Sequence, residues 1–132
     1  MANKTKHLEF IQGVINRLST NSFLLKGWSV VLVSALFALS VGGSNPAFIF
    51  LAYIPAIVFW GLDGYFLRQE RLYRALYDRV RALPEDEIDF SMDVSVVRNT
   101  VADWASVAVS GTLLAFHGVL LAAIIVVMLI AL

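Results

Sequence analysis

Residues 59–83 read FWGLDGYFLRQERLYRALYDRVRAL and join an uncharged segment to an arginine-rich one, with no proline between them. The preceding residues 46–62 carry no charge, whereas five arginines lie between positions 68 and 81. A continuous helix across this junction would lie half in a membrane and half in water, because a span needs about 20 predominantly apolar residues. The junction therefore predicts an all-α membrane protein in which one span extends into an arginine-rich helix.

The composition of the chain indicates the same class. Of its 132 residues, 59% are hydrophobic and 15% charged, whereas soluble domains carry about 25% charged residues. Basic and acidic residues balance at ten each, which does not favour nucleic acid as a partner. There is no cysteine, and the sequence has no nucleophile motif, phosphate-binding glycine loop or metal-ligand spacing. We expect no enzymatic activity, no cofactor and no metal.

Hydrophobic periodicity divides the chain into six parts of one membrane domain, residues 1–132. Apolar residues recur every three or four positions over 3–20, which predicts an amphipathic helix that ends where the polar residues 19–22 interrupt the pattern and offer N-caps. Pro55 predicts a kink in the second span. Thr100 and Asp103 resemble a capping box before the third span. The other five parts are span 1 at 23–42, span 2 at 46–63, an arginine-rich helix at 64–83, an acidic segment at 84–99 and span 3 at 104–132. A turn at 42–46 joins the first two spans.

The acidic segment alternates between apolar and polar residues from Ile88 to Ser95. A period of two is typical of a strand, but a single strand leaves its backbone unpaired. The segment would then lie extended across a neighbouring helix, pair with its copy in another subunit, or receive a strand from a partner. The simpler alternative is a loop whose apolar residues pack beside the arginine-rich helix.

The placement of basic residues predicts the orientation of the chain. Nine of the ten lie before the first span or after the second, Arg98 precedes the third, and the turn at 42–46 has none. Under the positive-inside rule the N-terminus and residues 64–103 are cytoplasmic, and the C-terminus lies at the outer leaflet. This orientation brings Lys26 and Asp63 to the same depth and predicts an interfacial ion pair. A proton-relay or cation-site role for Asp63 is the alternative.

Small residues recur at spacings of three and four along the third span. In lipid, small residues let helix backbones approach closely. The pattern therefore predicts a tight contact, either with the first two spans or with another copy of the chain. The members of this small-residue seam are Ala108, Gly111, Ala115, Gly118 and Ala122.

A polar stripe follows the cytoplasmic half of the third span, formed by Ser106, Ser110 and His117. Ionisable groups within a span are candidates for function, so this stripe would line a pore or gate in an oligomer. Alternatively, a neutral His117 hydrogen-bonds to a neighbouring helix. The arginine-rich helix would dock a cytosolic protein or anionic lipids, or remain solvated. Its docking residues are Arg68, Arg71, Arg74 and Arg81.

Two stretches, residues 21–28 (NSFLLKGW) and residues 59–81, resemble a family of small, little-characterised bacterial inner-membrane proteins. Such proteins tend to be encoded beside anti-phage defence genes, so the resemblance implies a transmembrane effector that acts with a separate cytosolic sensor. The chain is more distantly similar to the two-span effector modules of nucleotide-signalled defence systems, although it has a third span and no room for a ligand-sensing domain. The resemblance assigns no functional residues.

These observations lead us to expect a homo-oligomeric inner-membrane effector that permeabilises the membrane, or conducts across it, when a cytosolic partner triggers it. The first alternative is a non-conducting anchor or scaffold that recruits such a partner. The second is a small ion-coupled transporter that uses Asp63 and His117.

Overall fold

The computed structural model describes residues 2–41, 45 and 47–131, and these are almost entirely helical. The α-helices are α1 (Ala2–Val41), α2 (Phe48–Leu51), α3 (Tyr53–Arg81), α4 (Trp104–Ala108) and α5 (Gly111–Ala131), and two 3-10 helices, η1 (Glu85–Glu87) and η2 (Val94–Thr100), lie between α3 and α4. Three stretches are long and apolar enough to cross a membrane: Ala2–Val41, Phe48–Arg81 and Gly111–Ala131. The predicted all-α class is confirmed, with three helical stretches that could span a membrane. The N-terminal amphipathic helix and the arginine-rich extension stay predictions. Most of the expected turn at 42–46 lies outside the described residues.

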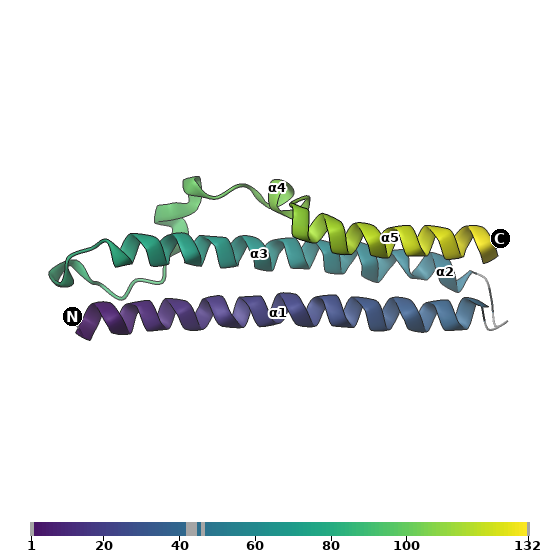
Figure 1. The fold of residues 1–132 in the computed structure, drawn as a ribbon, viewed down its shortest axis with the longest axis horizontal. Coiled ribbons are helices and arrows are strands. Elements are labelled where there is room, and N and C mark those ends of the chain that lie inside the picture. Colours follow the sequence, from purple (N-terminus) through teal and green to yellow (C-terminus); the bar gives the residue numbers. More distant parts are fainter. Residues whose placement is uncertain (1, 42–44, 46, 132) are drawn as a thin grey trace.

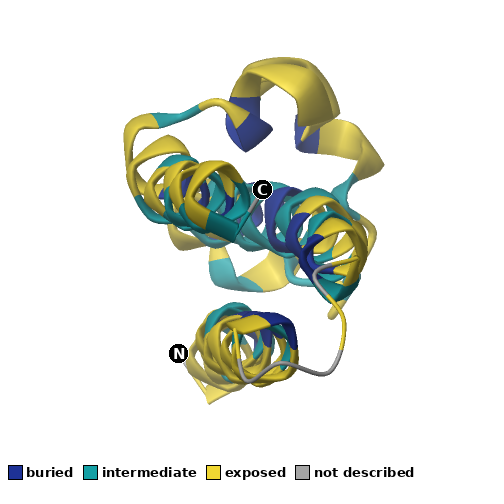
Figure 2. Cartoon of the chain, turned by 90° about the vertical axis from the view of Figure 1, so that its right-hand side faces the viewer, coloured by how far each residue is buried: buried dark blue, intermediate teal, exposed yellow. Residues whose placement is uncertain are grey.

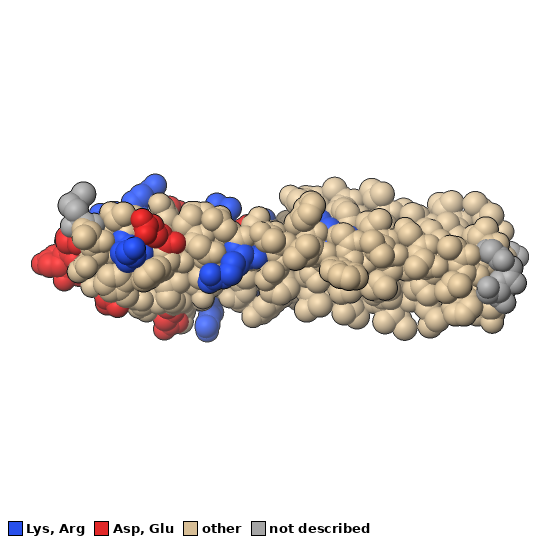
Figure 3. Space-filling model, turned by 90° about the horizontal axis from the view of Figure 1, so that it is seen from below, with Lys and Arg blue, Asp and Glu red and all other residues tan. Residues whose placement is uncertain are grey.

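The molecule is an elongated hairpin with a third helix beside one end (Figure 1). Helices α1 and α3 run antiparallel and pack along their length, while α5 lies against α2 and α3. Charged side chains gather at one end and the other end is uncharged (Figure 3). We call residues 2–22 and 64–104 the charged half, and residues 27–41, 47–62 and 105–131 the apolar half. Lys26 and Asp63 lie at the boundary between them.

Helix α1 is continuous over 40 residues, so the expected break at 19–22 is wrong. These polar residues lie inside the helix, and Ser22 donates its hydroxyl hydrogen to the Asp63 side chain instead of capping a new helix. Buried residues on the same face, Ile15 before them and Ser29 after them, hold both parts of α1 against the rest of the molecule. At about 1.5 Å per residue, α1 is about 60 Å long, roughly twice the thickness of the bilayer hydrocarbon.

The proline in the second span produces a short interruption of the helix. Helix α2 ends at Leu51 and α3 begins at Tyr53, which leaves Ala52 between them. Pro55 has no N–H to donate to the carbonyl of Leu51, four residues earlier, so a regular helix cannot continue through this point. The predicted kink at Pro55 corresponds to a one-residue interruption at Ala52, where the backbone keeps helical φ and ψ angles of −65° and −25°.

The charged half has its own apolar core between α1, α3 and η2. Its buried members are Ile11, Ile15, Leu72, Leu76, Val80 and Val97. Ile88, Met92 and Val94 of the alternating segment pack against this core, and no strand occurs among residues 47–131. The segment is therefore the loop of the simpler alternative. Its alternation arises because Ile88, Met92 and Val94 pack against the core. Glu85 accepts hydrogen bonds from the backbone N–H groups of Asn3 and Lys4, and so caps α1.

The third span is shorter than expected and does not begin at residue 104. Helix α4 ends at Ala108, and α5 begins at Gly111 after a break at Val109 and Ser110. The capping box is also placed differently: Asp103 caps α4 by accepting from the Ser106 N–H at 2.9 Å, while the Thr100 hydroxyl donates to the Val97 carbonyl. Because α4 and α5 are separate helices, residues before and after the break do not follow one helical periodicity.

Helix α5 packs through one narrow face. Its buried residues are Leu113, His117 and Ile124, and Ile124 joins a second core with Val33, Ile49, Ala52 and Ala56. Figure 2 shows the buried residues turned toward the interior of the three-helix arrangement, and exposed residues on the outward faces. The outward faces of the apolar half carry large hydrophobic side chains, as lipid contact requires.

Candidate functional site

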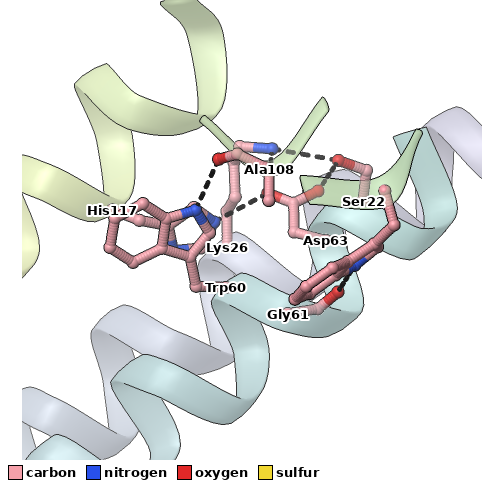
Figure 4. Close-up of polar contacts among 8 residues, drawn as sticks. Ser22, Lys26, Trp60, Gly61, Asp63, Ala108 and His117 are labelled. Carbon is pink, nitrogen blue, oxygen red and sulfur yellow. Dashed lines mark hydrogen bonds and ion pairs between the residues drawn. The ribbon is translucent and has the colours of Figure 1, made fainter. Parts of the chain in front are cut away.

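A cluster of polar side chains surrounds Asp63 where the three long helices meet (Figure 4). Asp63 is fully buried. Its Oδ2 lies 2.6 Å from Lys26 Nζ of α1 and 2.8 Å from His117 Nε2 of α5. Its Oδ1 accepts the hydrogen of the Ser22 hydroxyl, and Lys26 Nζ donates to the Ser22 oxygen at 2.9 Å. The structure thus contains the expected Lys26–Asp63 ion pair, and His117 binds a neighbouring helix.

The charges of the cluster compensate each other. A carboxylate accepts hydrogen bonds only, so the His117 Nε2 that faces it carries the proton. His117 Nδ1 is buried and has no hydrogen-bond partner in the described part of the chain, so an imidazole with a single proton matches its surroundings. One ammonium and one carboxylate then sum to zero. This balance is what a buried ionic cluster needs, because an unpaired buried charge is costly.

Two tryptophans fix the helices around this cluster. Trp60 Nε1 donates to the Ala108 carbonyl at 2.7 Å, and Trp104 Nε1 donates to the Gly61 carbonyl at 3.0 Å. The ring of Trp60 also stacks on His117, with centroids 5.6 Å apart and planes 7° from parallel. The two indole hydrogen bonds therefore connect α4 to α3. Stacking on Trp60 keeps the His117 ring parallel to the indole, with Nε2 directed at Asp63.

The glycines on either side of Asp63 make room for α4. A Cβ on Gly64 would lie 3.2 Å from the Cβ of Ala108 and 3.3 Å from its Cα, and one on Gly61 would lie 3.6 Å from the ring of Trp104. Our sequence reasoning did not single out these glycines. Their spacing of three places both near one face of α3, where the absence of side chains lets α4 approach closely.

The expected polar stripe of the third span is not formed. Ser106 is exposed on α4, Ser110 lies in the break with its hydroxyl buried, and His117 faces Asp63 of the same chain. The reason is the break at 109–110, which ends the single helical register on which the stripe depended. The three side chains therefore do not share one helical face, and their role in a pore or gate of an oligomer stays a prediction.

The small-residue seam divides in the same way. Ala108 packs on Gly64, but Gly111, Ala115 and Ala122 are exposed, and added Cβ atoms on Gly111 and Gly118 would meet nothing within 4 Å. Contact with the first two spans therefore accounts for Ala108 only. The remaining seam lies on the side of α5 opposite its buried face.

The four docking arginines differ in their surroundings. Arg68 Nε donates to the Ala102 carbonyl at 3.2 Å, while Arg74 and Arg81 pair with acids on their own helix, Glu70 at 3.7 Å and Asp78 at 3.5 Å. Exposed pairs of this kind contribute little to stability. Arg71 is partly buried and lines a crevice beside Lys26. The arginines thus share a helix without forming one uniform surface.

Comparison with known proteins adds no assignment. No cluster of three or more His, Asp or Glu side chains suited to a metal occurs among the described residues. No protein-family model, characterised protein or solved structure matches the chain.

Proposed function

We propose that the chain is a homo-oligomeric inner-membrane scaffold that presents a rigid cytoplasmic platform to a protein partner. One observation carries this proposal: α1 continues without a break from the apolar half into the charged half, and α3 does so beside it. The Asp63 cluster joins both helices to α5 at the boundary. A partner that binds the charged half would therefore be coupled directly to the bilayer helices.

The distribution of polar groups favours a scaffold over a channel lined by this chain. His117, Ser29 and Ser40 are buried between the helices, whereas the outward faces of the apolar half are dominated by large apolar side chains. A water-filled path needs polar groups on the surface that faces it, or a hydrophobic constriction that opens. The exposed faces of the apolar half do not provide such a polar surface.

Oligomerisation is supported by the seam on α5. Gly111, Ala115, Gly118 and Ala122 lie on a face of α5 away from its buried residues, and small residues in lipid favour helix contact. The natural absence of cysteine makes disulfide cross-linking a clean test. Ala115→Cys should cross-link two copies in native membranes, and Leu114→Cys, an exposed neighbour that points about 100° away, should not. Equal cross-linking at both positions would refute the contact.

A second test uses the open space beside the glycines. A Cβ at Gly118 would meet no described residue of its own chain within 4 Å, so we expect Gly118→Leu to fold normally and to lose the oligomer in detergent sizing. Its matched control is Val119→Leu, an exposed change one residue away with no small side chain removed. Retention of the oligomer in Gly118→Leu would contradict the proposal.

A second candidate function is conductance triggered by the partner, and the seam favours it. If α5 lies at the axis of an oligomer, movement of the charged half could separate the α5 helices. Reconstitution in liposomes distinguishes the two functions. The scaffold predicts no leak of ions or dye from liposomes that hold the purified oligomer, and no depolarisation of cells on expression. Depolarisation that requires intact α5 packing would favour conductance.

A further inference from the structure

A small crevice opens beside the Asp63 cluster, between α1, α3 and the first turn of α5. It has a volume of about 180 Å³ and lies at the boundary of the charged and apolar halves. Hydroxyl groups and charged groups line it: Ser19, Ser22, Lys26, Glu70, Arg71 and Thr112. Since a water molecule takes about 30 Å³, the crevice has room for about six, which suits a phosphate group and excludes a whole lipid.

Hydrogen-bond donors remain available in the crevice. The Lys26 ammonium has three N–H groups, of which one is directed to Asp63 and one to Ser22, and its side chain is still 20% exposed. Arg71 makes no hydrogen bond or ion pair with any residue the structure describes, so its guanidinium donors are also free. Ser19 and Thr112 add two hydroxyls. These donors come from all three helices.

One positive charge in the crevice has no acidic partner that the structure describes. Lys26 is compensated by Asp63 at 2.6 Å, and Glu70 faces Arg74 at 3.7 Å. The remaining charge is that of Arg71. A guanidinium with free donors in a partly buried site is well suited to a phosphate, because it can bind two oxygens at once.

We propose that this crevice binds the phosphate of an anionic phospholipid, with Arg71 as the main cation and Lys26 as a second donor. Apolar side chains, Leu18, Phe66, Leu67 and Leu113, complete the walls of the crevice. Its position favours a lipid over a free phosphate, because phospholipid headgroups lie at the edge of the membrane-spanning part. The single uncompensated charge favours a headgroup of net charge −1 over a zwitterionic one.

Native mass spectrometry of the full chain in detergent tests this site. The probes are phosphatidylglycerol and phosphatidylcholine of matched chain length. Arg71→Gln should weaken phosphatidylglycerol binding about fivefold, the equivalent of about 1 kcal/mol for one basic residue at a membrane surface, and should leave the weaker phosphatidylcholine binding unchanged. Arg81→Gln is the control, because Arg81 is exposed, pairs with Asp78 and lies on α3 far from the crevice.

Two further variants should change phosphatidylglycerol binding in the opposite direction or restore it in part. Glu70→Gln removes the one carboxylate that lines the crevice, so it should tighten phosphatidylglycerol binding. Arg71→Lys keeps the charge but not the planar fork, so it should restore part of the preference. The proposal fails if Arg71→Gln and Arg81→Gln have the same effect, or if Arg71→Gln weakens both lipids equally. Displacement of phosphatidylglycerol by millimolar inorganic phosphate would show a free-phosphate site and would also overturn it.

Discussion

Replacing Asp63 by asparagine should destabilise the protein more than any other conservative change at the boundary. The variant keeps the shape of the side chain but leaves the Lys26 ammonium without a counter-charge. At an effective dielectric constant of about 20, two unit charges 2.6 Å apart attract by about 6 kcal/mol. Desolvation offsets part of this attraction, and removal of one partner of a buried pair typically costs about 3–5 kcal/mol. We expect a loss within that range.

The double variant Lys26→Met/Asp63→Asn isolates the ionic part of this loss. It removes both charges, and the amide oxygen of an asparagine at position 63 can still accept the hydrogen bond from His117. Replacing a buried ion pair by neutral groups is often close to neutral in stability. The double variant should therefore be more stable than Asp63→Asn alone by about 2 kcal/mol or more.

Reversible unfolding in mixed detergent micelles measures these differences. Trp60 and Trp104 contact the cluster or the residues beside it, so their fluorescence reports its loss. The reasoning is refuted if Asp63→Asn costs less than about 1 kcal/mol, well below the expected cost of an unpaired buried charge. It is also refuted if the effects of Lys26→Met and Asp63→Asn simply add, because the two charges would then be independent.

Three other predictions concern the supports of the cluster. Gly64→Val should displace α4 and destabilise the protein by about 1–3 kcal/mol, as overpacking does, because even a Cβ at Gly64 would lie 3.2 Å from Ala108. The control is Gly27→Ala on α1, where a Cβ would meet no described residue within 4 Å. This change should be neutral or stabilising in the same unfolding assay. The Ser106 hydroxyl and N–H lower the pKa of Asp103 below its usual value of 3.8. The stability that this cap gives to α4 is therefore fully present above pH 3.8 and is lost as the pH falls through the lowered pKa. In Asp103→Asn, the thermal unfolding midpoint should fall less in acid than it does in the unaltered protein. Glu85→Ala should speed hydrogen exchange at the amides of Asn3 and Lys4, which lose their acceptor, and no change there would contradict the capping role.

The sequence alone predicted the elements of the fold whose cause is local. Three apolar stretches of sufficient length define the candidate spans, and antiparallel packing of the first two brings Lys26 and Asp63 to one depth. The third member of the cluster could not be predicted in this way. The direction of His117 depends on the break at Val109 and Ser110, and that break depends on α4 packing against Gly64, a contact between residues 44 positions apart.

Local signals failed where tertiary contacts compete with them. Residues 19–22 have good N-cap side chains, but Ser22 finds its acceptor in Asp63 and the helix continues. The alternation from Ile88 to Ser95 is a strand pattern, but a core on α3 accepts its apolar residues without any strand partner. Phe90 even takes a φ of 57° in this loop, a backbone angle uncommon for a residue other than glycine.

The way in which the Asp63 cluster is composed has a consequence for biogenesis. Its members come from positions 22, 26, 63 and 117, so they leave the ribosome in that order. Lys26 is synthesised before its acidic partner, and the pair with Asp63 forms only when α1 and α3 have packed together. His117 arrives last and completes the coordination of the carboxylate as α5 is inserted. The cluster is thus complete only when all three long helices are in place, and a chain that ends before position 117 would leave the Asp63 carboxylate without one of its three side-chain partners.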